Sequence, residues 1–523
     1  MRVFTTTAAL RCYLNSYMSQ EEPRRSQPQA SLVALVPTMG ALHAGHLSLI
    51  RRARLENGVV VVSIFVNPLQ FGPREDFQRY PRPLEQDRLI CQEAGVDVIF
   101  VPSAEELGVG SGNSAEFPVT TVVPPGAMTS VLCGKSRPGH FQGVATIVTK
   151  LLNLVNPDTA YFGIKDAQQV AIIRRLVADL NLSVKIVAGA IAREASGLAW
   201  SSRNQYLSSQ ERVQAATIYR SLQRARAVFE EGELTPAVLK AVVNEELARE
   251  PVVEVEYVEL VEPNSLRVLE VVEEAGLLAI AARIGSTRLI DNIMLLNRRP
   301  IVAIDGPAGA GKSTVTKQVA QVLGLRYLDT GAMYRAVTWL VLQTGTRMDD
   351  EAAIAELVSS CKIEFNFHPS SFTLHINGED VTQAIRTLEV TSHVSTVAAL
   401  AIVRRFMVEQ QQYYGRKGGI VAEGRDIGTN VFPDAEVKIF LTASVKERSR
   451  RRLIELQARG QNDISLEQLE LDIAERDEKD STREVAPLRK AVDAVEIQTD
   501  GLTIAQVTDR IVSLYKERNV AKR

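Results

Sequence analysis

The first 190 residues alternate between short, mainly apolar runs and longer segments with helical periodicity. The apolar runs Leu32 to Val36, Val59 to Val66 and Val96 to Val101 are of strand length and rich in β-branched residues. Such runs are typical of strands buried on both faces of a parallel sheet. Residues 19–30, rich in Ser, Gln and Pro, indicate a loop. The βαβ rhythm predicts a Rossmann-like sheet, which binds ligands at the carboxyl ends of its strands.

The pattern changes at about residue 190. Helical periodicity over 209–231 and 235–249 comes first, and shorter strand-like runs follow. This order predicts a small α+β domain over 191–292, because helices and strands are grouped rather than alternating. The three predicted strands are 252–261, 267–272 and 276–283.

A third domain is predicted after a short hinge, Asn297 to Pro300. The run Ile301 to Ile304 begins a new buried strand that leads into a glycine-rich loop. The expected boundaries are therefore 1–190, 191–292 and 293–523. The fold class is α/β, with the α+β domain at 191–292 between the Rossmann-like domain and the third domain. A chain of 523 residues is too long for one core, which agrees with several domains. No period of 20–50 residues indicates a solenoid.

Composition narrows the class of protein. The hydrophobic content of 45% and charged content of 23% are ordinary for a globular protein. A net charge of −2 argues against a surface devoted to nucleic acid. The four cysteines lack paired metal-ligand spacing, which favours structural thiols in a reducing compartment. The N-terminal residues lack a secretory apolar core and no run is long enough to span a bilayer, so we expect a cytoplasmic protein without membrane contact.

The glycine-rich loop after Ile304 satisfies the P-loop pattern, because it follows a strand and precedes a helix. Its glycines let backbone N–H groups converge on phosphate oxygens, and the following helix adds positive charge at its start. Lys312 is expected to pair with the β/γ-phosphates of ATP, and Ser313 to ligate Mg²⁺. The predicted ATP-binding residues are Gly306, Pro307, Ala308, Gly309, Ala310, Gly311, Lys312, Ser313 and Thr314.

Further motifs favour a kinase over a GTPase, since no Asn-Lys-x-Asp guanine signature follows the loop. The motifs Leu328 to Arg335, Glu423 to Thr429 and Arg476 to Arg483 resemble those of the cytidylate kinase family, over essentially all of 300–523. The strand-rich segment Ile363 to Val381, with Ile385-Arg386-Thr387 after it, matches the insertion of that family. The resemblance implies a P-loop nucleoside monophosphate kinase domain acting on CMP or dCMP.

The same resemblance assigns an acceptor site. An acceptor monophosphate is a dianion, which arginines suit, although a lone surface arginine is more often part of a weak ion pair. Asp426 is expected to select cytosine over uracil, because its carboxylate accepts from the cytosine amino group but faces an acceptor in uracil. Arg448, Arg450, Arg451 and Arg452, within the helical segment Lys446 to Gln461, resemble a lid that closes over ATP. The resemblance implies Arg335, Arg425 and Arg483 at the phosphate, Arg476 and Asp480 at the ribose, Ser395, Arg404 and Asp426 at cytosine, with Thr330 and Tyr334 beside them.

The first half carries a different phosphate-binding motif. Thr38-Met39-Gly40 ends the first predicted strand, and His43-Ala44-Gly45-His46 enters a helix. Histidines three apart share one helical face and can donate hydrogen bonds to ATP phosphates at a helix start. Capping histidines, core histidines or a metal-binding pair are the alternatives. The motif is the mark of the nucleotidyl-transfer superfamily, and Trp200 to Asn204 takes the place of its second, positively charged motif.

Four more segments resemble pantothenate synthetase (pantoate–β-alanine ligase) over residues 1 to about 292. The whole chain thus resembles the known fusion of that ligase with cytidylate kinase. One departure is Ile164, where the family commonly has a charged residue. The matching segments are Val62 to Phe71, Tyr80 to Arg82, Arg137 to Phe141 and Phe162 to Gln169.

The resemblance implies a two-step reaction that makes pantoyl adenylate and then pantothenate. His46 is the implied proton donor, and an imidazole with a pKa near 6.5 could serve at neutral pH. Asp87 or Asp166 is a candidate Mg²⁺ ligand. Gln70, Gln169 and Asn67 are implied at pantoate and β-alanine, although residues 67 and 70 could be turn residues. The implied phosphate ligands are His43, His46, Lys165, Ser201, Ser202 and Arg203; the rest of the ATP site is Met39, Gly40, Ala41, Leu42, Ala44, Gly45, Gly163, Ile164, Asp166, Ala192 and Trp200.

Two rival functions stay open from the sequence. One is another adenylyltransferase joined to a different nucleoside monophosphate kinase. The other is a nucleotide-sensing scaffold with one inactive site, although the complete set of charged residues weighs against it. The expected partners are small molecules only (pantoate, β-alanine, CMP or dCMP, and ATP with Mg²⁺), without nucleic acid. A homodimer through the ligase half is possible, because that family is commonly dimeric.

Overall fold

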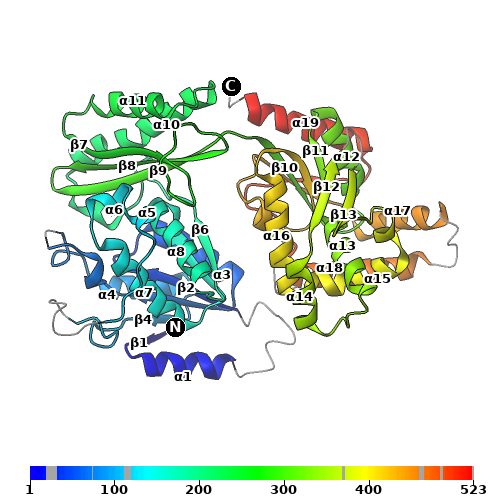
Figure 1. Ribbon diagram of the computed structural model, residues 1–523, viewed down its shortest axis with the longest axis horizontal. Coiled ribbons are helices and arrows are strands. Elements are labelled where there is room, and N and C mark those ends of the chain that lie inside the picture. Colours follow the sequence, from blue (N-terminus) through cyan, green and yellow to red (C-terminus); the bar gives the residue numbers. More distant parts are fainter. Residues whose placement is uncertain are drawn as a thin grey trace. The chain divides into compact units, whose positions relative to one another are not determined.

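The computed structural model describes residues 1–18, 32–73, 75–110, 119–367, 372–458, 465–482 and 487–520. The chain forms two compact units, Met1–Asn297 and Arg298–Arg523 (Figure 1). The predicted loop at 19–30 lies outside the described residues. Within the described ranges, no helix combines the length and apolarity needed to cross a membrane.

The first unit is built on a six-stranded parallel sheet, which confirms the predicted Rossmann-like fold. The predicted strands at 32–36, 59–66 and 96–101 correspond to β2 (Val33–Thr38), β3 (Val59–Ile64) and β4 (Val98–Phe100). The strand order is β1 (Arg2–Phe4), β4 (Val98–Phe100), β3 (Val59–Ile64), β2 (Val33–Thr38), β5 (Thr159–Gly163) and β6 (Lys185–Gly189).

Helices cover both faces of this sheet because alternate residues of its strands point to opposite sides. Val33 and Leu35 pack with α1 (Thr7–Met18), α7 (His140–Val155) and α8 (Ala167–Asp179). Ala34 and Val36 pack on the other face with α3 (Ala44–Glu56) and α4 (Leu84–Glu93). Short helices at the rim are η2 (Pro68–Gln70), α5 (Gly126–Thr129), α6 (Leu132–Ser136), η3 (Ile164–Asp166) and η4 (Ser202–Tyr206).

The rest of the first unit is the predicted α+β part. An antiparallel sheet of β7 (Val253–Val261), β8 (Ala275–Ile284) and β9 (Thr287–Leu296) packs against α10 (Thr217–Glu230) and α11 (Pro236–Leu247). The helix expected over 209–231 is divided at Ala216 into α9 (Ser209–Ala215) and α10.

Two details of this part differ from the sequence prediction. The strand expected at 267–272 is wrong, since only an isolated bridge joins Val268 to Val261. Strand β9 was not predicted, because the buried polar residues Asp291 and Asn292 interrupt its apolar pattern. It continues through Leu296, beyond the expected boundary at 292.

The second unit contains a five-stranded parallel sheet. Ile301 and Ala303 of its central strand pack with α13 (Thr330–Gln343) and α16 (Ala401–Gly415). Val302 and Ile304 pack with α12 (Lys312–Leu323) and α19 (Ile504–Val520). The predicted strand at 301–304 is confirmed, but Arg299 and Pro300 already belong to it rather than to a hinge. The strand order is β11 (Arg326–Asp329), β15 (Gly418–Glu423), β10 (Arg299–Asp305), β16 (Val437–Thr442) and β17 (Val495–Gln498).

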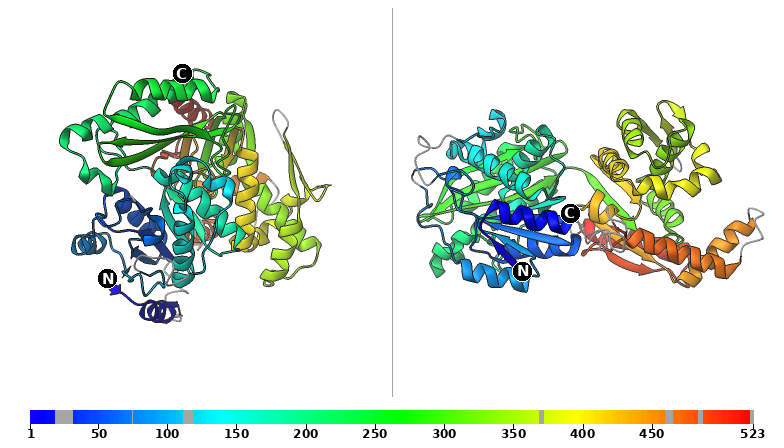
Figure 2. Two further views of the ribbon diagram at one scale, coloured as in Figure 1. Left: turned by 60° about the vertical axis from the view of Figure 1, so that its left-hand side comes forward. Right: turned by 90° about the horizontal axis from the view of Figure 1, so that it is seen from below.

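The remaining elements surround this sheet, and α17 and α18 pack against each other in a pair that Figure 2 shows side by side. The expected insertion at 363–381 is present as the antiparallel strands β12 (Ile363–Phe367), β13 (Phe372–Ile376) and β14 (Glu379–Asp380). The helices are α12 (Lys312–Leu323), α13 (Thr330–Gln343), α14 (Glu351–Ser360), η5 (Ala384–Arg386), α15 (Leu388–Ala399), α16 (Ala401–Gly415), η6 (Ile427–Val431), α17 (Val445–Ala458), α18 (Leu466–Thr482) and α19 (Ile504–Val520).

Candidate active sites

A cavity of about 740 Å³ opens at the carboxyl ends of β2, β3 and β5, and β8 and β9 contribute to its far wall. Most residues that the sequence assigned to the ligase site line it. The lining includes Met39, His43, Gly45, His46, Asn67, Gln70, Gly163, Lys165, Asp166, Gln169, Ala192, Trp200, Ser201, Ser202 and Arg203. Gly40, Ala41, Leu42, Ala44, Ile164 and Asp87 are not part of the lining.

The two histidines cap α3 and line the cavity at the same time. His43 is the N-cap residue, and its Nδ1 accepts a hydrogen bond from the Gly45 N–H at 3.1 Å. His46 Nδ1 accepts from the His43 N–H at 3.4 Å. Because both Nδ1 atoms are acceptors, the neutral rings carry their protons on Nε2. Two Nε2–H donors therefore remain for a ligand at the start of the helix, where the dipole favours anions.

Burial keeps both rings uncharged near neutral pH. It lowers the pKa of His43 to about 4, and the nearby Lys165 acts in the same direction. Burial lowers the pKa of His46 well below its usual range, with further contributions from His43 and Lys165. The expectation that His46 titrates near 6.5 is therefore corrected: in the protein without ligand, the neutral imidazole donates through Nε2–H.

Asp87 supports the loop that precedes α3. Its Oδ2 accepts from the Ala41 N–H at 2.9 Å, and its Oδ1 accepts from the Leu42 N–H at 2.7 Å. The residue is 1% exposed. The expectation that Asp87 ligates Mg²⁺ is not supported by this geometry, because both oxygens are engaged by backbone amides outside the cavity lining. Asp166 lines the cavity and is exposed.

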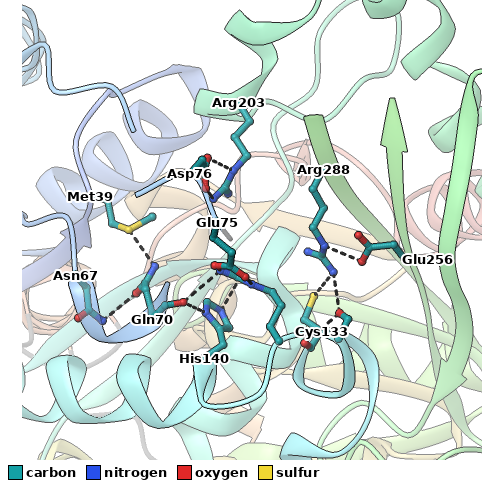
Figure 3. Close-up of polar contacts among 12 residues, drawn as sticks. Met39, Asn67, Gln70, Glu75, Asp76, Cys133, His140, Arg203, Glu256 and Arg288 are labelled. Carbon is teal, nitrogen blue, oxygen red and sulfur yellow. Dashed lines mark hydrogen bonds and ion pairs between the residues drawn. The ribbon is translucent and has the colours of Figure 1, made fainter. Parts of the chain in front are cut away.

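Gln70 projects from η2 and is oriented by its neighbours (Figure 3). Its Oε1 accepts from Asn67 Nδ2 at 3.0 Å, and its Nε2 donates to Met39 Sδ at 3.0 Å. Asn67 is buried and also donates to Gly143 O at 3.1 Å. Asn67 thus acts as a turn residue that holds Gln70, which was one of the two interpretations of its sequence. Gln169 is half-buried on α8 at the cavity.

Two ion pairs tie a loop after η2 to the cavity walls (Figure 3). Asp76 binds Arg203 through both oxygens, at 2.9 Å each. Glu75 binds Arg137, with 2.6 Å between Oε1 and Nε. Arg137 in turn lies 3.1 Å from His140 Nε2, and His140 Nδ1 lies 2.8 Å from Gln70 O. Arg137 and His140 belong to a motif of the sequence that predicted no role for them, and no local pattern indicated the two acids.

The serines and the lysine of the site are also positioned by contacts that the sequence did not reveal. Ser201 Oγ accepts from the Arg203 N–H at 3.2 Å, and Ser202 Oγ lies 3.1 Å from the Tyr80 hydroxyl. Asn292 of β9 donates to Lys165 O at 2.9 Å and to Ile164 O at 3.0 Å. A buried polar residue in an antiparallel strand therefore sets the position of the η3 backbone that carries Lys165.

In the second unit, the P-loop curls around the Lys312 ammonium group. Lys312 Nζ donates to Gly306 O and Pro307 O at 2.7 Å each. Gly306, Gly309 and Gly311 have positive φ angles of 146°, 78° and 85°. A side chain at Gly306 would place its Cβ 2.0 Å from Leu441 O, so glycine is required there. Ser313 and Thr314 begin α12 and are exposed, as ligands of an incoming phosphate or metal would be.

Two buried carboxylates behind the P-loop were not selected from the sequence. Asp305 accepts from the N–H groups of Ile427 and Gly428 at 2.7 Å each, and burial raises its pKa to about 6. Glu423 Oε1 accepts from the Tyr327 hydroxyl at 2.5 Å. Burial, followed by the charge of Asp329, raises the pKa of Glu423. Its Oε2 is buried without a hydrogen-bond partner among the described residues.

The predicted acceptor residues gather near the ends of β15 and α18. Asp426 and Arg404 form a buried ion pair of 2.8 Å, and the Arg404 guanidinium lies 5.5 Å from the centre of the Tyr334 ring. Arg425 Nε donates to Asp480 Oδ2 at 2.8 Å. The pKa of Arg476 is lowered, first by loss of solvation and then by neighbouring cations that include Arg425 and Arg335. Such a cluster of cations favours an anionic ligand.

The other residues predicted at the acceptor site differ in their surroundings. Thr330 donates from Oγ1 to Glu423 O at 2.6 Å, which places it next to the P-loop carboxylates. Ser395 is exposed on α15. Arg483, expected at the acceptor phosphate, lies outside the described residues.

Fold and sites together define a protein with a nucleotidyltransferase-like half and a P-loop kinase-like half. A family model described as Pantoate-beta-alanine ligase matches residues 2–294, and one described as Cytidylate kinase matches residues 302–517. The chain is 62% identical over 530 residues to a bifunctional pantoate ligase/cytidylate kinase of Trichormus variabilis, with 99% of each chain covered. It is 56% identical to the protein of that name from Synechocystis, again with 99% of each covered.

Solved structures agree for the first half. The crystal structure of pantothenate synthetase from Thermus thermophilus is 44% identical and covers 56% of this chain and 99% of its own, with a TM-score of 0.50. The chain belongs to the bifunctional pantoate ligase/cytidylate kinase family. The predicted families of both halves are thereby confirmed, and both families use ATP.

Proposed function

We propose that this protein catalyses two ATP-dependent reactions, one in each unit. The first unit condenses pantoate with β-alanine through pantoyl adenylate, giving pantothenate, AMP and pyrophosphate. The second transfers a phosphoryl group from ATP to CMP or dCMP. The observation that carries the proposal is the presence of two separate helix starts suited to binding phosphate, at His43 with His46 and at Lys312. They lie in a chain 62% identical over its length to a relative with that double name.

In the ligase site, we assign the ATP phosphates to the two Nε2–H donors, Lys165 and the Ser201–Arg203 segment. A pantoate carboxylate bound by Gln70 and Gln169 would attack the α-phosphorus and expel pyrophosphate. The resulting acyl adenylate has a good leaving group, so the β-alanine amine can then attack its carbonyl and release AMP. Fixed donors around the transferred group stabilise the charge that develops on its oxygens.

In the kinase site, we assign the β/γ-phosphates to the P-loop amides and Lys312. The ammonium would exchange its two backbone carbonyls for phosphate oxygens. Arg335, Arg425, Arg476 and Arg483 would bind the acceptor phosphate and ribose, while Asp426, held by Arg404, would accept from the cytosine amino group. Phosphoryl transfer needs such positioning and charge neutralisation more than covalent catalysis.

We further propose that Mg²⁺ binds with ATP in the kinase half. The donor set fits a hard cation, because the exposed Ser313 hydroxyl and the unpartnered Glu423 Oε2 are both oxygen ligands at the P-loop. When bound, Mg²⁺ neutralises phosphate charge. In the ligase half, Asp166 is the better candidate than Asp87.

Three wider assignments are also proposals. The ligase would consist of 1–190 and 191–292 together with the end of β9 up to Asn297, and the kinase of the rest of 293–523. A cytoplasmic location is supported by the four free cysteines, as expected in a reducing compartment. A homodimer through 191–292 is supported by the exposed Val255 on the edge strand β7, and sedimentation analysis would test it.

Separate product assays test the double function. His46→Ala should abolish AMP and pantothenate formation and leave CDP formation intact. Lys312→Ala should do the reverse. His375→Ala and Lys516→Ala, which change the same residue types outside both sites, are the matched controls. Loss of both products in one variant that remains folded, or absence of both in the unaltered protein, would contradict the proposal and favour the scaffold alternative.

A different acid or nucleotide as substrate is the second alternative. A panel of hydroxy acids, amines and nucleoside monophosphates would decide it. Preference for a pair other than pantoate with β-alanine, or for an acceptor other than CMP or dCMP, would replace the proposed substrates.

A further inference from the structure

Helix α17 contacts the P-loop through two of its arginines. Arg448 Nη1 donates to Ala308 O at 3.1 Å, within the loop. Arg451 Nη1 donates to Thr499 Oγ1 at 3.1 Å, and Thr499 Oγ1 lies 3.4 Å from Ala310 O. Two carbonyls of the loop are thus held by contacts that begin on one face of one helix.

Arg448 is committed to this support and is not placed to close over ATP. It is 3% exposed. Its Nε donates to Ala443 O at 3.0 Å, and its Nη1 donates to Asp477 Oδ1 at 2.9 Å. Its Nη2 binds the second oxygen of Asp477. A guanidinium whose three nitrogens are all engaged has little left to offer a phosphate. The family resemblance placed Arg448 in a lid, whereas in the structure its guanidinium joins the Ala308 carbonyl of the loop to Asp477.

Helix α18 contacts both substrate sites of the kinase. Asp477 holds Arg448 and, through it, the P-loop. One turn later, Asp480 accepts from Arg425, the arginine assigned to the acceptor phosphate. Residues three apart on a helix share a face, so a shift of α18 at one contact moves the other. An acceptor phosphate at Arg425 would compete with Asp480 for the guanidinium, because Asp480 accepts from its Nε.

We propose that Arg448 and Asp477 form a positioning pair that couples CMP binding to the shape of the ATP loop. The proposal rests on the kinase function given above. Binding of the acceptor releases Asp480 from Arg425, and the resulting adjustment of α18 passes through Asp477 and Arg448 to the Ala308 peptide. The charged, two-pronged geometry of the pair transmits the shift because a guanidinium and a carboxylate fix each other in orientation as well as distance.

Coupling is measured through CMP, which has one proposed site, rather than through ATP, which has two. The full-length protein is titrated with CMP by calorimetry, with and without a saturating non-hydrolysable ATP analogue and Mg²⁺. Linkage makes the effect of the analogue on CMP affinity equal to the reverse effect. We expect the analogue to tighten CMP binding about fivefold or more in the unaltered protein.

Asp477→Asn keeps the size of the side chain and removes its charge. We expect the coupling factor to fall below about twofold, while the Kd of CMP alone stays within about twofold of the unaltered value. The KM for ATP in the kinase reaction should rise more than the KM for CMP. Asp472→Asn, on an exposed position of the same helix, is the matched control and should keep full coupling.

Arg448→Lys gives an independent test if Asp477→Asn does not fold. Lysine keeps the positive charge but cannot form the two-pronged contact with Asp477. Full coupling in either folded variant would overturn the proposal, as would absence of coupling in the unaltered protein. If the unaltered protein neither bound CMP nor formed CDP, the kinase function itself would fail, and the inference would fail with it. Normal CDP formation with unchanged coupling in Asp477→Asn would reject the positioning pair alone.

Discussion

Arg203 and Asp76 face each other as a two-pronged ion pair, with Nε 2.9 Å from Oδ2 and Nη2 2.9 Å from Oδ1. Their side chains are 26% and 18% exposed, so solvent screens the pair only in part. Arg203 is one of the groups that we assign to the ATP phosphates. Asp76 is therefore already paired with a guanidinium that we assign to the substrate, and the ATP phosphates must compete with Asp76 for Arg203.

Asp76→Asn should lower the KM for ATP in the ligase reaction by about twofold to tenfold, because it removes the competing charge. Steady-state assays of AMP formation measure this, with Glu85→Gln as a control on an exposed acid. A rise in KM would show instead that Asp76 holds Arg203 in its productive position. CDP formation should not change in either variant.

ATP binding at the ligase site should take up protons at mildly acidic pH. The pKa of His43 is about 4 without ligand, and phosphate oxygens favour the charged ring, so its pKa must rise when ATP binds. Binding should therefore tighten as pH falls from about 6.5 towards 4. Calorimetry in buffers of different ionisation enthalpy measures the uptake, with Lys312→Ala as background to remove the kinase site. Proton release, or no uptake, would contradict the assignment of His43.

The same lowered pKa affects folding with a definite sign. The unfolded chain binds the proton near pH 6.5, whereas the folded protein binds it only near pH 4. The contribution of His43 to the free energy of unfolding is therefore fully present above about pH 6.5 and is lost as pH falls towards 4. His43→Gln should flatten this part of the curve, by about 1–2 kcal/mol at pH 5. Chemical denaturation of the variant and the unaltered protein at pH 7 and pH 5 tests this. An equal change in the free energy of unfolding between the two pH values in both proteins would contradict it.

Gly143 permits η2 to approach α7 and so places Gln70. A Cβ at this position would lie 2.2 Å from Leu69 O and 2.7 Å from Gln70 N. Gly143→Ala should push η2 away, raise the KM for pantoate about tenfold or more, and lower the unfolding temperature of the ligase unit by about 4 °C or more. Gly126→Ala, where no atom lies within 4 Å of the added Cβ, is the control. An unchanged KM for pantoate in a folded Gly143→Ala protein would show that Gln70 does not bind pantoate.

Glu423→Gln should weaken the binding of Mg²⁺ at the P-loop. The substitution removes a buried carboxylate oxygen that has no hydrogen-bond partner in the described structure. We expect the Mg²⁺ concentration for half-maximal CDP formation to rise about tenfold. Binding of Mn²⁺ with ATP, followed by electron paramagnetic resonance, gives a readout that does not depend on turnover. An unaltered Mg²⁺ requirement would assign Glu423 a purely structural role beside Tyr327.

Asp426→Asn should narrow the preference for CMP over UMP. The amide can donate as well as accept, so it no longer faces the O4 acceptor of uracil unfavourably. Because Asp426 is also paired with Arg404, loss of overall activity is expected, and the ratio of kcat/KM values is the quantity to compare. Equal ratios in the variant and the unaltered protein would remove Asp426 from base selection.

Local sequence patterns predicted two kinds of element. These are strands whose residues are nearly all apolar, and loops whose residue types suit the start of a helix. The strands at 59–66 and 301–304 and both phosphate-binding motifs belong to this group. The prediction failed at β9, where Asp291 and Asn292 are polar because they bind Arg193 and the Lys165 backbone. It also failed at 267–272, where apolar residues do not find a strand partner over their length.

The sequence by itself determined the apolar strands of the two parallel sheets, the glycines of the P-loop and the histidine motif, because each depends on residues close together in the chain. Only the tertiary structure decided the state of those residues. Burial turned His43 and His46 into neutral donors, and backbone amides engaged Asp87. Acids from other segments of the chain paired with Arg203, Arg137 and Arg448. Charge and solvation depend on what surrounds a group in space, and neighbours in space come from parts of the chain that no local pattern connects.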